Sequence, residues 1–228
     1  HVDSSAASDV YKRQALDKGA DIVITGRCVD SALVLAPLMH EFGWNESDYN
    51  LLASGSLAGH IIECGAQCTG GNFTDWKDVN GFEDMGFPIV EVEGNGDFIV
   101  SKPKGTGGMV TFGTVAEQFL YEIGNPAEYI LPDVVCDFTE VTINDLGEDR
   151  VHVSGASGSP PTDKYKVSAT FMDGYRVNGT LVIGGRDSDL KGEIIANAII
   201  KKVNNILKEK KLDPLNKISY DLIGTDSI

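Results

Sequence analysis

Hydrophobic residues follow different spacings in the two halves of this 228-residue chain. In the first half, the short apolar run Asp21-Ile-Val-Ile-Thr25 predicts a buried strand of the parallel type, because both faces of such a strand are hydrophobic. Helical spacing follows over residues 30–42, with Gly43 as the expected C-cap. A second helix is expected to begin at residue 51 or 56 and to end at residue 67.

Turn residues and caps divide the middle of the chain. Residues 88–92 and 97–101 have strand-like patterns, and the glycine-rich turn at residues 94–96 predicts that they form a hairpin. Thr114 and Glu117 match the T-x-x-E capping box, which predicts the start of the next helix. A glycine and a proline shortly afterwards predict where this helix ends.

The second half predicts mostly strands and one long helix. The helix is expected over residues 189–210, with apolar residues along one stripe and lysines on the other face. A last strand is expected at residues 218–223. The other strand-like segments are residues 133–138, 140–144, 150–154, 165–172 and 175–183.

Together these patterns predict an α/β fold class. We expect a partial α/β first half of parallel type, followed by a β-rich α+β second half with one long helix. The expected organisation is a tail at residues 1–14, a truncated α/β domain at residues 15–131, and an α+β segment at residues 132–228 that is also truncated. An exposed apolar edge is therefore expected beside Asp21-Thr25, where upstream strands would have paired.

Residues 1–14 have no apolar periodicity. The stretch DVYKRQ within them back-translates to bases that resemble the transposase end used in sequencing adapters. We predict that residues 1–14 are a non-native adapter translation, with a natural disordered N-terminus as the alternative. Either way, we expect them to pack against nothing, because they have no apolar face to offset the entropy of ordering.

Composition narrows the classes of partner. Hydrophobic residues make up 42% of the chain and charged residues 23%, which is ordinary for a globular protein. A net charge of −15 disfavours a nucleic-acid partner, and no run approaches the roughly 18 apolar residues of a membrane span. The four cysteines lack the spacing of a zinc site or a disulfide framework, so we expect reduced thiols, no metal and a cytoplasmic location.

The segment from Ser54 to Cys68 carries the most chemistry. On a helix, His60, Glu63 and Cys64 lie about one turn apart and near one face. A histidine beside a carboxylate could exchange protons, and Cys64 could be a nucleophile if its pKa were lowered. The alternative is a structural helix that packs through its glycines, with His60 hydrogen-bonded and the thiols buried.

Anion-binding groups are expected in two loops. Arg27 follows the predicted first strand, where ligands bind in α/β sheets, and Asp30 stands close to it. Lys104, Thr106 and Gly107 belong to a glycine-rich loop with two lysines, whose free amides could hold an anion. The alternatives are a helix cap at Asp30 and a tight turn with solvated lysines.

A second glycine-rich stretch ends in Asp75 and Trp76. Asp75 could help to line a pocket for an apolar substrate, and a plain structural loop is the alternative. The chain has no G-x-G-x-x-G motif, so the sequence gives no support for a nicotinamide cofactor and leaves the cofactor unknown.

Four blocks of sequence, taken in order, resemble one known family. They are GADIVITGRCVDSALVLAPLMHEFGW, ASGSLAGHIIECGAQCTGGNFTDW, KGTGGMVTFGTVAEQFLYEIGNPAEYILPDVVCDFT and VSGASGSPPTDKYKVSATFMDGYR. The chain from Ala15 to Ile228 is similar to the acyclic terpene utilisation family AtuA, found in bacteria that degrade citronellol and geraniol. Members are longer at both ends, so the resemblance implies an internal piece of such a protein. It implies catabolism of branched acyclic acids or their CoA esters, and assigns no catalytic residues.

The function we expect is acid–base chemistry on a branched carboxylate or acyl-CoA, such as hydration, dehydration or a lyase step. The alternative is a non-catalytic binding or assembly subunit of the same pathway, and the sequence leaves a homo-oligomer open. In the enzyme, His60 and Glu63 would move protons, while Arg27 and the loop at residues 102–108 would hold the anionic group. We expect these groups to meet in one cleft, and His60 buried in the core would contradict that.

Overall fold

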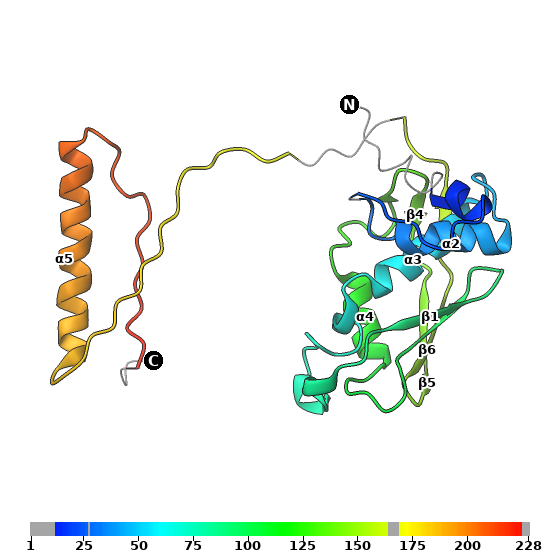
Figure 1. The fold of residues 1–228 in the computed structure, drawn as a ribbon, viewed down its shortest axis with the longest axis horizontal. Coiled ribbons are helices and arrows are strands. Elements are labelled where there is room, and N and C mark those ends of the chain that lie inside the picture. Colours follow the sequence, from blue (N-terminus) through cyan, green and yellow to red (C-terminus); the bar gives the residue numbers. More distant parts are fainter. Residues whose placement is uncertain (1–11, 27, 164–168, 225–228) are drawn as a thin grey trace. The chain divides into compact units, whose positions relative to one another are not determined.

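The computed structural model describes residues 12–26, 28–163 and 169–224, and the chain divides into two compact units between residues 168 and 169 (Figure 1). Among its described residues, the first unit contains a helical segment at residues 12–17, the helices α2, α3 and α4, and seven short strands. The second unit contains the long helix α5. Among the described residues, no helix combines the length and the hydrophobicity needed to cross a membrane.

The helices of the first unit start and end at recognisable signals. Helix α2 spans Ala32–Phe42 and ends at Gly43, whose φ of 65° confirms the predicted left-handed cap. Helix α3 spans Tyr49–Ile62 and is followed by a separate 3₁₀ turn, η1, at Gly65–Gln67. Helix α4 spans Phe112–Leu120. Two further 3₁₀ turns are η2 at Trp76–Asp78 and η3 at Phe82–Asp84.

Two antiparallel sheets complete the first unit. The larger sheet has the order β1-β2-β6-β5, and the smaller one has the order β3-β4-β7. The predicted hairpin is confirmed, because β1 and β2 pair antiparallel with Val90 opposite Val100. The bounds are Ile89–Val92 (β1), Phe98–Ser101 (β2), Tyr129–Ile130 (β3), Val135–Asp137 (β4), Thr142–Gly147 (β5), Arg150–Ser154 (β6) and Ser157–Ser159 (β7).

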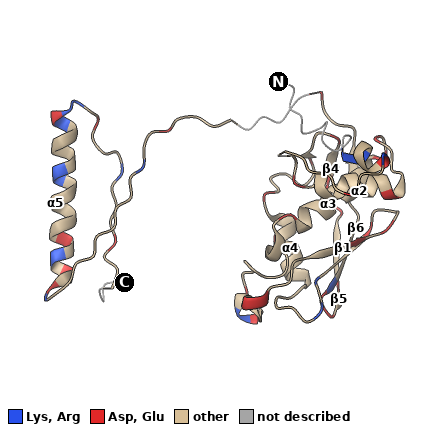
Figure 2. Cartoon of the chain, viewed as in Figure 1, with Lys and Arg blue, Asp and Glu red and all other residues tan. Residues whose placement is uncertain are grey.

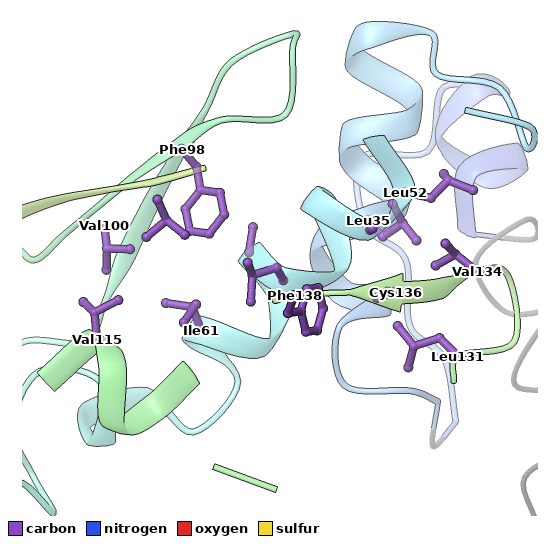
Figure 3. Close-up of a cluster of buried hydrophobic side chains, with 14 of the residues drawn as sticks. Leu35, Leu52, Ile61, Phe98, Val100, Val115, Leu131, Val134, Cys136 and Phe138 are labelled. Carbon is purple, nitrogen blue, oxygen red and sulfur yellow. The ribbon is translucent and has the colours of Figure 1, made fainter. Parts of the chain in front are cut away.

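Helix α3 lies at the centre of the hydrophobic core. Every residue from Leu52 to Ile61 is buried, and α3 contacts α2, α4 and strands of both sheets. Figure 3 shows side chains from these elements meeting in one cluster, including Phe98 and Val100 of β2 and Phe138 after β4. Burying a side chain of this size contributes about 1.5–3 kcal/mol, so the cluster is the main source of stability in this unit.

The mixed helix-and-sheet class is confirmed, but the predicted parallel strand at Asp21–Thr25 is wrong. Residues 22–25 have no regular secondary structure, and Ile22 and Ile24 are 81% and 91% exposed. Among the described residues, every ladder between named strands is antiparallel. The apolar run therefore fits a strand by composition, but no described strand offers it a ladder of hydrogen bonds.

The prediction that residues 1–14 pack against nothing is wrong for residues 12–14, the part of this segment that the structure describes. Residues 12–17 are helical, and Lys12 is buried with its Nζ donating to Cys28 Sγ at 2.8 Å. Arg13 Nη1 donates to the carbonyl oxygen of Trp44 at 3.2 Å. Residues 12–14 therefore pack onto the first unit, while residues 1–11 lie outside the described residues.

The start of α4 lies one turn before its predicted position. Thr111 is the N-cap, and its hydroxyl accepts from the Thr114 amide while Thr114 Oγ1 accepts from the Thr111 amide. The carboxylate of Glu117 instead accepts a hydrogen bond from the Thr74 amide at 3.2 Å. The helix ends at Leu120, and Glu122 takes a φ of 60° in the turn that follows.

The second unit confirms the long helix and contradicts the strands around it. Helix α5 spans Ser188–Glu209, within one residue of the predicted bounds. Residues 169–183 and 218–223 form no strands, and residues 165–168 lie outside the described part. Phe171 and Tyr175 are 84% and 96% exposed. A strand pattern becomes a strand only where a neighbour supplies hydrogen bonds, and none of the described residues does so here.

Candidate functional site

His60 joins helix α3 to helix α4. Its side chain is only 5% exposed, and Nε2 lies 3.3 Å from the carbonyl oxygen of Phe119. A carbonyl oxygen only accepts, so Nε2 donates this hydrogen bond. In return, Gln118 Nε2 donates to the carbonyl oxygen of His60 at 2.8 Å. This reciprocal pair satisfies carbonyl groups near the ends of both helices.

Burial keeps the imidazole of His60 neutral. It lowers the pKa of His60 below 6.5, although nearby Glu63 and the carbonyls of Phe119 and Gln118 act in the opposite direction. The ring also lies against Tyr129, with 6.4 Å between the ring centroids. His60 therefore faces the core, and the prediction that it opens into a common cleft with the loop at residues 102–108 is wrong.

Glu63 and Cys64 follow directly after α3 and form a pair. Cys64 Sγ donates to Glu63 Oε1 at 3.2 Å. Burial raises the pKa of Cys64 to about 11, and the hydrogen bond and negative charge of Glu63 add to the effect, while the Gln118 side chain opposes it. The thiol is therefore protonated at neutral pH, which disfavours the nucleophile hypothesis.

Alkylation should show the raised pKa of Cys64 directly. A pKa of about 11 instead of 9.0 leaves roughly 100-fold fewer thiolates at about pH 8. We expect the iodoacetamide rate at Cys64, followed by mass spectrometry, to be still rising with pH at about pH 9.5. Limited access would scale this profile without moving its midpoint. Glu63→Gln should move the midpoint downward, and a native midpoint at the ordinary value of 9.0 would contradict the assignment.

Glu122 and Tyr129 interact electrostatically with the same group of residues at the end of α3. Glu122 acts electrostatically on His60, Cys64 and Tyr121, raising the pKa of Tyr121 most strongly through its charge. The pKa of Tyr129 is raised by burial first, then by Cys136, Glu63 and Glu122. We call the group His60, Glu63, Cys64, Gln118, Glu122 and Tyr129 the His60 cluster.

Gln118 carries an unusual feature of the His60 cluster. Its side chain is fully buried, and its Oε1 has no hydrogen-bond partner among the described residues. A buried acceptor without a donor is costly, so the packing of α4 and the hydrogen bond from Gln118 Nε2 to His60 hold this side chain in place. Sequence reasoning missed Gln118, Glu122 and Tyr129, because only the packing of α4 and β3 brings them to the end of α3.

The residues predicted to bind anions have separate surroundings. Arg27 lies outside the described residues. Asp30 precedes α2 and belongs to the charges that raise the pKa of Tyr129, although it is the smallest of them. Asp75 is exposed before η2, and its side chain makes no capping hydrogen bond there.

The loop at residues 102–108 is held by internal contacts. Thr106 Oγ1 donates to the Pro103 carbonyl at 2.7 Å, and the amide of Gly107 donates to the Asp84 carbonyl at 2.7 Å. A Cβ at Gly107 would lie 1.8 Å from the carbonyl oxygen of Gly81, so this position requires glycine for close packing. Of the three predicted residues in this loop, Lys104 is exposed, Thr106 is partly buried, and the Gly107 amide is already hydrogen-bonded.

A separate hollow of about 590 Å³ lies on the first unit. It is lined by Arg13, Asn45, Glu46, Tyr49 and Asp133, among others, and by none of the predicted site residues. No group of three or more histidine, cysteine, aspartate or glutamate side chains suited to a metal occurs in the described parts of the chain.

Comparison with known proteins identifies the family. No curated protein and no solved structure matches the chain. The model of one family, described as acyclic terpene utilisation family protein AtuA, matches residues 13–228. That match covers most of the chain, including all the elements described above. The chain therefore belongs to the acyclic terpene utilisation family AtuA.

Proposed function

We propose that this protein is a catabolic enzyme of acyclic terpene utilisation that performs acid–base chemistry on a branched carboxylate or acyl-CoA. The reaction class would be hydration, dehydration or a lyase step, each of which needs a group that takes a proton and a group that returns it. Arg27 and Lys104 are our candidates for holding the anionic end of the substrate.

The observation that carries the proposal is the His60 cluster itself. The negative charges of Glu63 and Glu122 both act on a neutral histidine, a protonated thiol and a partly buried tyrosine. Glu63 is partly exposed and Glu122 is exposed, so both can exchange protons with a ligand. His60 is buried, and we assign it the task of positioning the end of α4, because its ring donates to the Phe119 carbonyl.

The direct test is turnover of a panel of terpenoid acids and their CoA esters. Glu63→Gln and Glu122→Gln should each lower kcat by roughly 100-fold or more, since general acid–base catalysis is typically worth that much. Glu91→Gln on strand β1, an exposed carboxylate in the same unit, is the matched control and should leave kcat unchanged. Full activity in both cluster variants, with folding verified by circular dichroism, would refute acid–base catalysis at this cluster.

A second candidate is a binding or assembly subunit of the same pathway. The observation that favours it is exposed apolar surface, such as Ile22 and Ile24 in the first unit. Such residues commonly mark a surface that a partner covers. This candidate predicts that Ile24→Asp abolishes association with a pathway enzyme, whereas Glu63→Gln does not.

A further inference from the structure

Helix α5 has one face that its own unit covers and another that it leaves open. Gly192 is buried, and a Cβ there would lie 2.8 Å from Leu222 Cδ2. A different row of residues, spaced four apart, is exposed along the helix, with Leu190 at 59% and Ile194 at 68%. Such a row forms one ridge on a helix surface. We call this row the α5 ridge: Leu190, Ile194, Ala198, Lys202 and Ile206.

Acidic residues outnumber basic ones in the first half of α5, and lysines outnumber acidic residues in the second half (Figure 2). The first half and the two residues before the helix carry Asp187, Asp189 and Glu193 against Arg186 and Lys191. The second half and the two residues after it carry Lys201, Lys202, Lys208, Lys210 and Lys211 against Glu209. In a chain of net charge −15, this second half is an unusually basic surface.

The helix dipole explains only part of this arrangement. Acidic residues at the N-terminus and lysines at the C-terminus stabilise a single helix, but the effect fades within the first and last turns. Lys201 and Lys202 lie about two turns before Glu209, where the dipole offers little. Neither does the dipole account for apolar side chains exposed along the ridge.

We propose that the α5 ridges of two copies of this chain pack against each other in an antiparallel dimer. The ridge is symmetric about Ala198, with Leu190 and Ile206 eight residues away on either side, so a two-fold axis at Ala198 pairs them. A small residue at the crossing point lets the two helices approach closely. Ile194 then meets the aliphatic stem of Lys202 from the other copy.

The charge distribution along α5 favours a second copy of the chain as the partner, and it favours an antiparallel arrangement of the two helices. Two antiparallel α5 helices set the acidic half of each against the basic half of the other, whereas a parallel pair would bring like charges together. The 22-residue helix is about 33 Å long, so one crossing buries less than a standard interface and should give a dimer of micromolar affinity. This inference does not depend on the proposed enzymatic function.

Sedimentation velocity of the full chain, from about 5 to about 200 µM, tests the dimer in the range expected for a small interface. We expect a monomer–dimer equilibrium that weakens between about 50 and about 500 mM NaCl, because salt screens the charge pairing. Ile194→Asp should raise the Kd at least tenfold. Ile223→Asp is the matched control, because Ile223 is 88% exposed in the same unit and lies off the ridge.

Charge-reversal substitutions distinguish antiparallel pairing from nonspecific hydrophobic association. The double change Lys201→Glu and Lys202→Glu should raise the Kd, and adding Asp189→Lys and Glu193→Lys should restore it. A monomer at all concentrations, a polydisperse aggregate, or equal effects of Ile194→Asp and Ile223→Asp would overturn the proposal. So would binding to vesicles containing phosphatidylserine without any dimer, because the basic half would then serve a membrane surface.

Discussion

Gly59→Ala should destabilise the first unit by about 3 kcal/mol, at the upper end of the cost of overpacking a core. A Cβ at Gly59 would lie 2.5 Å from both the Cα and the carbonyl oxygen of Ser31. These are backbone atoms at the start of α2, so relief requires the two helices to move apart. Alanine is the better helix former by about 0.5–1 kcal/mol, and that gain is too small to offset the clash.

Gly55→Ala on the same helix is the matched control. A Cβ at Gly55 would meet Leu35 Cδ1 at 2.9 Å, Trp44 Cζ3 at 3.1 Å and Leu38 Cδ1 at 3.3 Å, and all three are side-chain atoms that can shift without moving the backbone. Repacking there costs little, so the helix-propensity gain should bring the net change to within about 1 kcal/mol of zero.

Urea unfolding followed by tryptophan fluorescence measures both variants, because Trp44 is 3% exposed in the first unit. Equal stability losses at the two glycines would show that α3 does not approach Ser31 as closely as the structure indicates. The same variants bear on function, because movement of α3 away from α2 also displaces His60, the residue after Gly59.

Local signals in the sequence were sufficient to predict several elements of secondary structure. Gly43 ended α2 as predicted, and the turn at residues 94–96 joined β1 to β2. Helix α5 was predictable because a long helix satisfies its own backbone hydrogen bonds. In each case, the residues that determine the structure lie within a few positions of the element.

Predictions failed where the outcome depends on distant partners. Glu117 has the right spacing for a capping box with Thr114, but the hydroxyl of Thr111 caps the helix one turn earlier. The carboxylate of Glu117 instead accepts a hydrogen bond from the Thr74 amide. Residues 21–25 and 169–183 have the composition of strands, and no neighbouring strand pairs with their described parts.

In the candidate site, too, local sequence predicted some features, and contacts with distant residues determined the others. His60, Glu63 and Cys64 were found from helical spacing, and the structure keeps them together at the end of α3. Their roles were not predictable, because burial decides them: it leaves His60 neutral and Cys64 protonated. Gln118 and Glu122 lie more than fifty residues away in sequence and carried no local motif.

Asp149→Asn should cost the first unit about 2 kcal/mol, because it leaves a buried lysine without its counter-ion. Lys102 is only 5% exposed and its Nζ lies 3.1 Å from Asp149 Oδ2, with a second hydrogen bond to the Thr106 carbonyl at 2.9 Å. Asp149 is 39% exposed, which places the loss below that of a fully buried pair. Asparagine tolerates the φ of 56° at this position and can still accept from the Val110 amide, so the change removes mainly the charge.

The reverse change should be mild, and this asymmetry is the decisive test. Lys102→Met replaces the buried charge by an apolar side chain of similar length, while Asp149 remains hydrated, so we expect a loss below about 1 kcal/mol. Combining the two changes should cost no more than Lys102→Met alone, since the unpaired buried charge is then gone. Glu148→Gln, beside Asp149 and also at positive φ, is the matched control and should change stability by less than about 0.5 kcal/mol. Additive losses in urea unfolding would mean that the pair does not hold the loop at residues 102–108 against the β5–β6 hairpin, and that Lys102 is free to meet an anionic ligand after all.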